Sequence, residues 1–198
     1  MGRMFAMALL VFLIAGRVSA EPPENQQLLT PKLAALAFVH AMELNDMPGF
    51  QAVTLGAEDD YKLFEPLLGM VGSAKQLEKA AREQFGKAGR VIVRDSPAVG
   101  LEVQVQESDV QVTGDTAILR HKGHEKDDPL TIRKTVQGWK VDLTAIQNRE
   151  QMSAAAPGMK KMQDALTLTT SDIRAARFKT AEEAEQVLLK RMKMAAEK

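Results

Sequence analysis

The sequence predicts an α+β fold in which N-terminal helices pack on an antiparallel meander sheet and a C-terminal helical tail follows. Three observations support this prediction. Apolar residues recur at three- and four-residue steps up to about residue 86, which is typical of helices. From about residue 91 they alternate with polar residues, which indicates strands. Helical spacing returns beyond residue 158.

The first twenty residues have the pattern of a signal peptide. Arg3 precedes the apolar run FAMALLVFLIAG, and Val18, Ser19 and Ala20 suit a cleavage site. We therefore expect an exported protein, periplasmic or extracellular, that begins at Glu21. No later apolar run is longer, and a spanning helix needs about 20 apolar residues, so no membrane span is expected after signal removal. The chain has no Cys, so we expect neither disulfides nor a cysteine-linked lipid anchor.

Charge and length narrow the function classes. Lys and Arg number 26 together, as do Asp and Glu, which argues against the concentrated basic face of a nucleic-acid-binding protein. Residues 21–29 are polar and contain two prolines, which predicts a flexible leader. We divide the rest into a domain at 30–146 and a linker with an amphipathic helical tail at 147–198, since domains commonly span roughly 100–200 residues.

Two helical regions are expected before the sheet. Thr30 can cap a helix that continues from Pro31 to about Asp46, and the sequence MPG at 47–49 breaks it. A short segment at 50–55 leads into a second helical region that ends at Gly86. We expect Pro66 and the glycines at 69 and 72 to kink or split this region. Four of its residues should face a core: Leu77, Ala80, Ala81 and Phe85.

The first strands are expected between residues 91 and 120. Leu101, Val103 and Val105 alternate with polar residues, whereas Val110 and Val112 continue at even numbers, so a bulge or turn is expected at 107–109. Gly114 and Asp115 predict a two-residue hairpin turn that places Val110 opposite Leu119 and Val112 opposite Ala117. A charged loop then precedes a strand at 130–136.

The segment TVQGWKVDL at 135–143 predicts a second hairpin. A turn at Gln137-Gly138 would place Val136 opposite Trp139, Ile132 opposite Leu143 and Arg133 opposite Asp142. Apolar side chains would then share one face and polar side chains the other. We interpret Asp142 as half of a solvent-side ion pair with Arg133, and Trp139 as a core residue at the end of the sheet.

The tail contains two expected helices. Residues 145–158 are interpreted as a linker, and the amphipathic spacing after it involves Met159, Met162, Leu166, Ile173 and Ala176. The sequence TAEE at 180–183 is a capping box that opens a last helix. The apolar face of that helix consists of Ala184, Val187, Leu188, Met192 and Ala195. These helices either pair with each other or lie along the domain.

Helices followed by a meander with VTGDTAILR and LTIRKTVQGWKVDL resemble the nuclear transport factor two-like superfamily, also described as a cystatin-like cone. The likeness is strongest to small exported bacterial domains, through GDTA at 114–117 and GWKVDL at 138–143, and it covers about residues 30–146. It implies a curved sheet wrapped around the helices. It also implies either a binding or dimerising module, or an isomerase or dehydratase that uses Asp, His or Tyr inside the cone.

Few residues are candidates for chemistry. His40 lies on a mostly apolar helix, so we expect it to be partly buried, where it could act as a base with Tyr61 as a donor. Asp142 could join them only if the two faces of the sheet are assigned the other way round, so that Asp142 points inward. One loop contains possible metal ligands, but its glycine and charges favour a solvated connection: His121, His124, Glu125, Asp127 and Asp128. We predict no metal and no cofactor.

The first hypothesis is an exported, non-catalytic domain that binds a small apolar ligand or a protein partner, with a homodimer through the sheet or tail as an option. The alternative is an acid/base enzyme that uses His40. A third hypothesis assigns the function to the tail alone.

Overall fold

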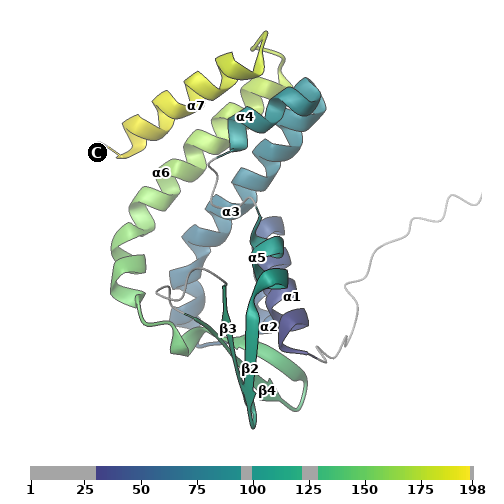
Figure 1. The fold of residues 1–198 in the computed structure, drawn as a ribbon. Helices are drawn as coiled ribbons and strands as arrows, with labels where there is room; N and C mark the ends of the chain where they lie inside the picture. The colour runs from purple at the N-terminus through teal and green to yellow at the C-terminus, as the bar shows by residue number, and fades with distance from the viewer. Residues whose placement is uncertain (1–29, 95–99, 122–128, 197–198) are drawn as a thin grey trace, which may run out of the picture.

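The computed structural model describes residues 30–94, 100–121 and 129–196 (Figure 1). The predicted signal peptide and leader at 1–29 lie outside this part of the chain. The elements are α1 (Pro31–Leu44), α2 (Met47–Val53), β1 (Thr54–Leu55), α3 (Glu58–Phe85), the short 3-10 helix η1 (Gly86–Gly89), α4 (Arg90–Val93), α5 (Leu101–Glu107), β2 (Asp109–Thr113), β3 (Thr116–Arg120), β4 (Leu130–Thr135), β5 (Gly138–Asp142), the 3-10 helix η2 (Leu143–Ala145), α6 (Arg149–Arg174) and α7 (Ala181–Ala196).

The molecule has a mixed end and a helical end. Figure 1 shows the sheet with α1 and α2 at one end, and α4, α7 and the far halves of α3 and α6 at the other. The long helices α3 and α6 connect the two ends and run parallel, because Ser73 lies beside Thr167 and Gly69 beside Gln163. The predicted order of N-terminal helices, sheet and C-terminal helices is confirmed.

The first helix begins where the sequence predicts. The Thr30 hydroxyl accepts a hydrogen bond from the Leu33 backbone N–H at 3.2 Å, and the helix ends at Asn45, whose φ is +53°. The MPG sequence does interrupt it but also starts α2, because the Asp46 carboxylate accepts from the Gly49 N–H at 3.1 Å. Helix α2 was missed because its seven residues carry no periodic pattern long enough to read.

Of the two outcomes expected at Pro66 and the glycines, a kink or a split, the split is wrong, because helix α3 is continuous from 58 to 85. The glycines serve close packing instead. A Cβ on Gly69 would lie 2.6 Å from the Gln163 side chain, and one on Gly72 would lie 2.8 Å from the Asn45 Cβ. The absence of side chains there lets α6 and the end of α1 approach α3. The predicted stop at Gly86, where φ is +59°, is confirmed.

The residues around 101–105 form a helix, not the predicted strand. Leu101 and Val105 are four residues apart, which suits a helix as well as an alternating strand. Tertiary packing selects the helix: Val105 is buried and α5 contacts α1, whereas Val103 is exposed. The expected bulge at 107–109 is the end of this helix at Ser108.

The sheet has strand order β1-β5-β4-β3-β2, with β1 parallel to β5 and the other pairs antiparallel. The predicted turn at Gly114-Asp115 is confirmed, as are the pairs Val110–Leu119 and Val112–Ala117. The sheet is not curled, so the curvature expected from the family resemblance is not found.

The second hairpin is formed, but its predicted register is wrong. Its turn is Val136-Gln137, and the pairs are Ile132–Val141, Arg133–Lys140 and Lys134–Trp139. The Thr135 hydroxyl accepts from the Gln137 N–H at 3.1 Å and donates to the Gly138 carbonyl at 2.8 Å. Gly138 takes a φ of +107°, which favours glycine. The shift is two residues, so the strand faces are preserved while Val136 becomes 98% exposed.

The core between α1 and the sheet is filled with side chains. Phe50 is fully buried, and its ring centroid lies 5.2 Å from that of Phe38 and 5.6 Å from that of Phe64. Trp139 is 8% exposed and belongs to the same core, as predicted. Sheet residues complete it: Ala117, Leu119, Ile132, Val141 and Leu143.

Helix α6 begins at Arg149, so residues 149–158 are helical where a linker was predicted. Its start is tied to α3 by the ion pair of Arg149 with the buried Asp60. The predicted apolar face of α6 is buried at Leu166 and Ile173, but Ala176 lies beyond the helix and is exposed. A linker was predicted because Pro157 and Gly158 favour loops when read without this tertiary contact.

Helix α7 folds back along α6, and its predicted apolar face is confirmed as the inward one. Thr180 accepts from the Glu183 N–H at 3.2 Å, as a capping box requires. The Glu183 carboxylate accepts from Lys179, one residue before the expected donor. Arg191 joins the two helices by donating to Thr169 at 3.0 Å and to Asp172 at 2.6 Å.

Candidate functional site

An apolar pocket of about 210 Å³ lies at the helical end of the molecule. Four helices form its walls: α3, α4, α6 and α7. Most of the lining is aliphatic or methionine, from Met70, Val71, Ala74, Leu77, Val91, Ile92, Val93, Met162, Leu166, Leu188, Leu189 and Met192. These apolar side chains offer dispersion contacts to an occupant.

Three methionines line different sides of this pocket: Met70 on α3, Met162 on α6 and Met192 on α7. Their side chains are partly exposed, and unbranched thioether chains adapt to occupants of different shape. The sequence predicts the inward faces of α6 and α7, but it does not show that α4 closes the space between them and α3.

One ionisable group lines the pocket. Glu185 is 20% exposed at its side chain and accepts a hydrogen bond from the Arg94 guanidinium at 3.2 Å. Arg94 comes from the end of α4, so this ion pair also holds α4 against α7. The pair places a polar contact next to an otherwise apolar space.

A second hollow of about 750 Å³ lies at the end of α3, next to η1 and α4. It is lined by exposed basic side chains, among them Arg82, Lys87 and Arg90. Although it is larger, it is a poor anion site, because the partial negative charge at the C-terminal end of a helix opposes anions. We therefore take the smaller apolar pocket as the candidate site. Neither hollow is lined by His40 or Tyr61.

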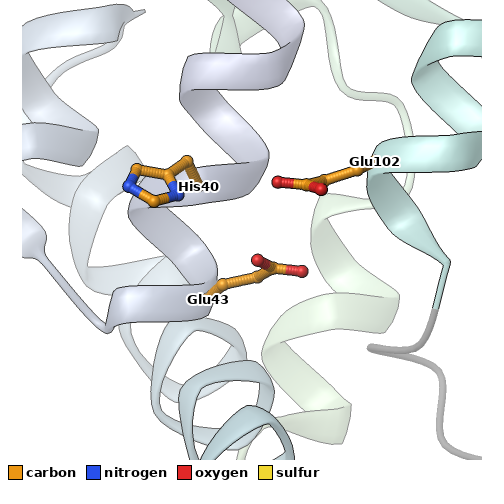
Figure 2. A group of neighbouring side chains, drawn as sticks. All are labelled: His40, Glu43 and Glu102. Carbon is orange, nitrogen blue, oxygen red and sulfur yellow. The ribbon is translucent and has the colours of Figure 1, made fainter.

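His40 is exposed on α1, so its predicted burial is wrong. The neighbouring positions Phe38 and Val39 face the core, which leaves His40 on the outer side of the helix. It has carboxylate neighbours instead. Figure 2 shows its ring near Glu43 of α1 and Glu102 of α5, and one ligand atom from each of the three residues lies within 4.8 Å of the others.

Glu43 is the buried member of this group. Its side chain is 7% exposed, and its Oε1 lies 3.3 Å from the Lys75 Nζ. Partial burial tends to lower the pKa of Lys75, but the carboxylates of Glu43 and Glu78 outweigh it and hold that pKa above 10.5. Among the described residues, His40, Glu43 and Glu102 form the group whose ligand atoms lie close enough together to hold a metal ion. The sequence did not reveal the group because Glu102 was assigned to a strand.

Tyr61 lies on α3 and is half-buried. Its ring packs edge-on against Phe50, with centroids 6.4 Å apart and planes at 81°. It therefore contributes to the aromatic core beside α2.

Asp142 is buried, so the predicted solvent-side position is wrong, although Arg133 is its partner as expected. Strand β1 covers this sheet edge by pairing Leu55 with Asp142. The carboxylate also accepts from the Thr144 N–H at 3.0 Å and from the Thr144 hydroxyl at 2.6 Å. Burial would raise the pKa of Asp142, but the bonds from Thr144 and Arg133 outweigh it and hold the pKa below 3.8.

The proposed loop ligands fall mainly outside the described residues. His124, Glu125, Asp127 and Asp128 lie at 122–128, and His121 alone belongs to the described part. Among the residues that the structure describes, none of the helices combines the length and the apolar character needed to cross a membrane. Comparison with known proteins finds no match to any family model, any curated protein or any solved structure.

Proposed function

We propose that this protein is a non-catalytic binding module that holds a small apolar molecule in the pocket formed by α3, α4, α6 and α7. The observation that carries the proposal is the lining of that pocket, which is aliphatic or thioether on all four helices. Burying apolar ligand surface there would supply the binding free energy, at about 25 cal/mol per Å².

The volume limits the occupant. A dry apolar cavity of about 150 Å³ holds benzene in a well-studied case. The present pocket of about 210 Å³ would accept a substituted single ring or a short branched hydrocarbon. Glu185 and Arg94 could meet one polar group on such a ligand.

Export and membership of the nuclear transport factor two-like superfamily are part of the same proposal. The support for export is the signal-like pattern of residues 1–20, and the support for membership is GDTA at 114–117 with GWKVDL at 138–143. The proposed pocket lies at the helical end of the molecule, away from the sheet. The ligand site would therefore depend on the helices at 149–196 together with α3 and α4.

The test of this proposal is a substitution that fills the pocket with a larger side chain. Ala74 is 4% exposed and lines the pocket from α3, so Ala74→Leu should place its added carbons in the cavity. The same substitution at the exposed Ala155 of α6 is the matched control. Binding would be measured by isothermal titration calorimetry of the full chain, with toluene as the probe.

We expect the native chain and Ala155→Leu to bind the probe, and Ala74→Leu to bind at least about tenfold more weakly, which is 1.4 kcal/mol. Thermal unfolding would show that Ala74→Leu keeps its fold, since filling a cavity commonly stabilises. Equal probe binding by all three folded proteins would refute the pocket as the site.

A further inference from the structure

The group of His40, Glu43 and Glu102 lies apart from the apolar pocket and has no part in the proposed function. His40 and Glu43 are three residues apart and therefore share one face of α1. Glu102 comes from the first turn of α5, so the group joins two helices that are distant in sequence. In Figure 2 the carboxylates of Glu43 and Glu102 extend into the same space between α1 and α5. One ligand atom of His40 lies within 4.8 Å of a carboxylate oxygen of each.

We propose that His40, Glu43 and Glu102 bind one divalent transition-metal ion, with Zn²⁺ as the ion of choice, and that this ion links α5 to α1. The ligand atoms lie within 4.8 Å of one another. With Zn–N and Zn–O bonds of about 2.0–2.2 Å, tetrahedral ligands are about 3.3 Å apart. The exposed His40 and Glu102 need only small side-chain rotations to close that difference.

The charge balance favours a cation. Lys75 pairs with the carboxylates of Glu43 and Glu78, each at 3.3 Å, and Glu102 adds a third carboxylate beside Glu43. Lys75 pairs with Oε1 of Glu43, which leaves Oε2 to coordinate a metal while Lys75 keeps the carboxylate oriented. Such an outer contact is typical of metal ligands. The imidazole favours Zn²⁺ over Ca²⁺ or Mg²⁺, which prefer all-oxygen ligands.

The site is open on one side. Three protein ligands leave at least one position for water, since Zn²⁺ takes four or five ligands. Helix α5 otherwise contacts α1 through the buried Val105 and through the Lys32 ammonium, which donates to the Gln106 carbonyl at 2.7 Å. A metal bound at Glu102 would fix the opposite end of this short helix.

The experiment is a calorimetric titration of the chelator-treated full chain with Zn²⁺. We expect one equivalent to bind, and His40→Ala and Glu102→Gln each to weaken binding by at least about 100-fold, the upper end of what the loss of one supporting contact costs. Glu107→Gln, at an exposed position on the same helix, should bind Zn²⁺ like the native chain. With Co²⁺, the visible absorption bands of the native complex should change in His40→Ala.

The double variant His121→Ala/His124→Ala separates this site from the charged loop. It should retain Zn²⁺ binding. Loss of binding in that variant alone, absence of binding by the native chain, or unchanged affinity in both His40→Ala and Glu102→Gln would overturn the proposal. His40 and Glu102 are both exposed, so circular dichroism should show native folding in both single variants. If His40→Ala does not fold, the affinity of Glu102→Gln for Zn²⁺ tests the proposal. Ala74→Leu should bind Zn²⁺ normally, which keeps this test independent of the apolar pocket.

Discussion

The Asp142 carboxylate should contribute measurably to folding stability through its three hydrogen bonds. In Asp142→Asn, the amide oxygen can still accept from Thr144, but the amide nitrogen then faces the Arg133 guanidinium, and both groups are donors. The substitution therefore removes one ion pair and weakens two charge-assisted bonds without changing the size of the side chain.

The magnitude follows from these contacts. The Arg133 side chain is 56% exposed, so its ion pair contributes about 0.2–1 kcal/mol. Each Thr144 bond loses about 1 kcal/mol when its acceptor becomes neutral. Because relief of the buried charge offsets part of this loss, we expect Asp142→Asn to lower the free energy of unfolding by about 2 kcal/mol, or the Tm by about 4–8 °C.

Urea unfolding of the full chain would measure this difference, with Arg133→Gln as the comparison. Arg133→Gln should cost only the ion pair, about 0.2–1 kcal/mol. Equal losses in the two variants would show that Thr144 contributes nothing.

The effect should also depend on pH, and its sign follows from the lowered pKa. The pKa of Asp142 is lower in the folded chain than the ordinary value of 3.8, which applies to the unfolded chain. Between the folded and the unfolded pKa, the unfolded chain therefore binds more protons. The stability from Asp142 is therefore fully present above about pH 5 and is lost as the pH falls through the lowered pKa. The gap between native chain and Asp142→Asn should shrink below about pH 4, and a gap that stays constant down to about pH 3 would refute this reasoning.

Two further predictions concern helix packing. Gly72→Ala should destabilise the chain by about 1–3 kcal/mol, because the new Cβ would lie 2.8 Å from the Asn45 Cβ. Gly158→Ala, with open space around it in α6, should stabilise the chain by about 0.5–1 kcal/mol. Chemical denaturation would measure both changes, and equal effects would contradict the packing argument. Arg149→Gln should cost about 1–3 kcal/mol, because it leaves the buried Asp60 carboxylate without its cation, and an unchanged unfolding midpoint would contradict that role.

Local rules explain the parts of the fold that the sequence predicted. The cap at Thr30, the stop at Gly86, the turn at Gly114-Asp115 and the cap at Thr180 each depend on hydrogen bonds or dihedral angles within a few residues. These interactions form within the segment itself, wherever the segment lies in the molecule. Their signals can therefore be read without knowing the fold.

Other errors arose where two local structures were equally compatible with the residues. LEVQVQE at 101–107 alternates like a strand, yet it also places Leu101 and Val105 on one helical face, and contact with α1 selects the helix. Pro157 and Gly158 favour a loop, but the packing of α6 along α3 includes them in a helix.

Both candidate sites are formed by segments that lie far apart in the sequence, and no local sequence pattern shows that these segments meet. The apolar pocket combines residues 70–77 with 91–93, 162–166 and 185–192, and the proposed metal site joins residues 40–43 to residue 102. The sequence by itself determined helix caps, hairpin turns and which faces are apolar, because these follow from neighbouring residues. The tertiary structure alone decided which faces meet, which carboxylates are buried and where space is left between helices, because those depend on packing among segments far apart in the chain.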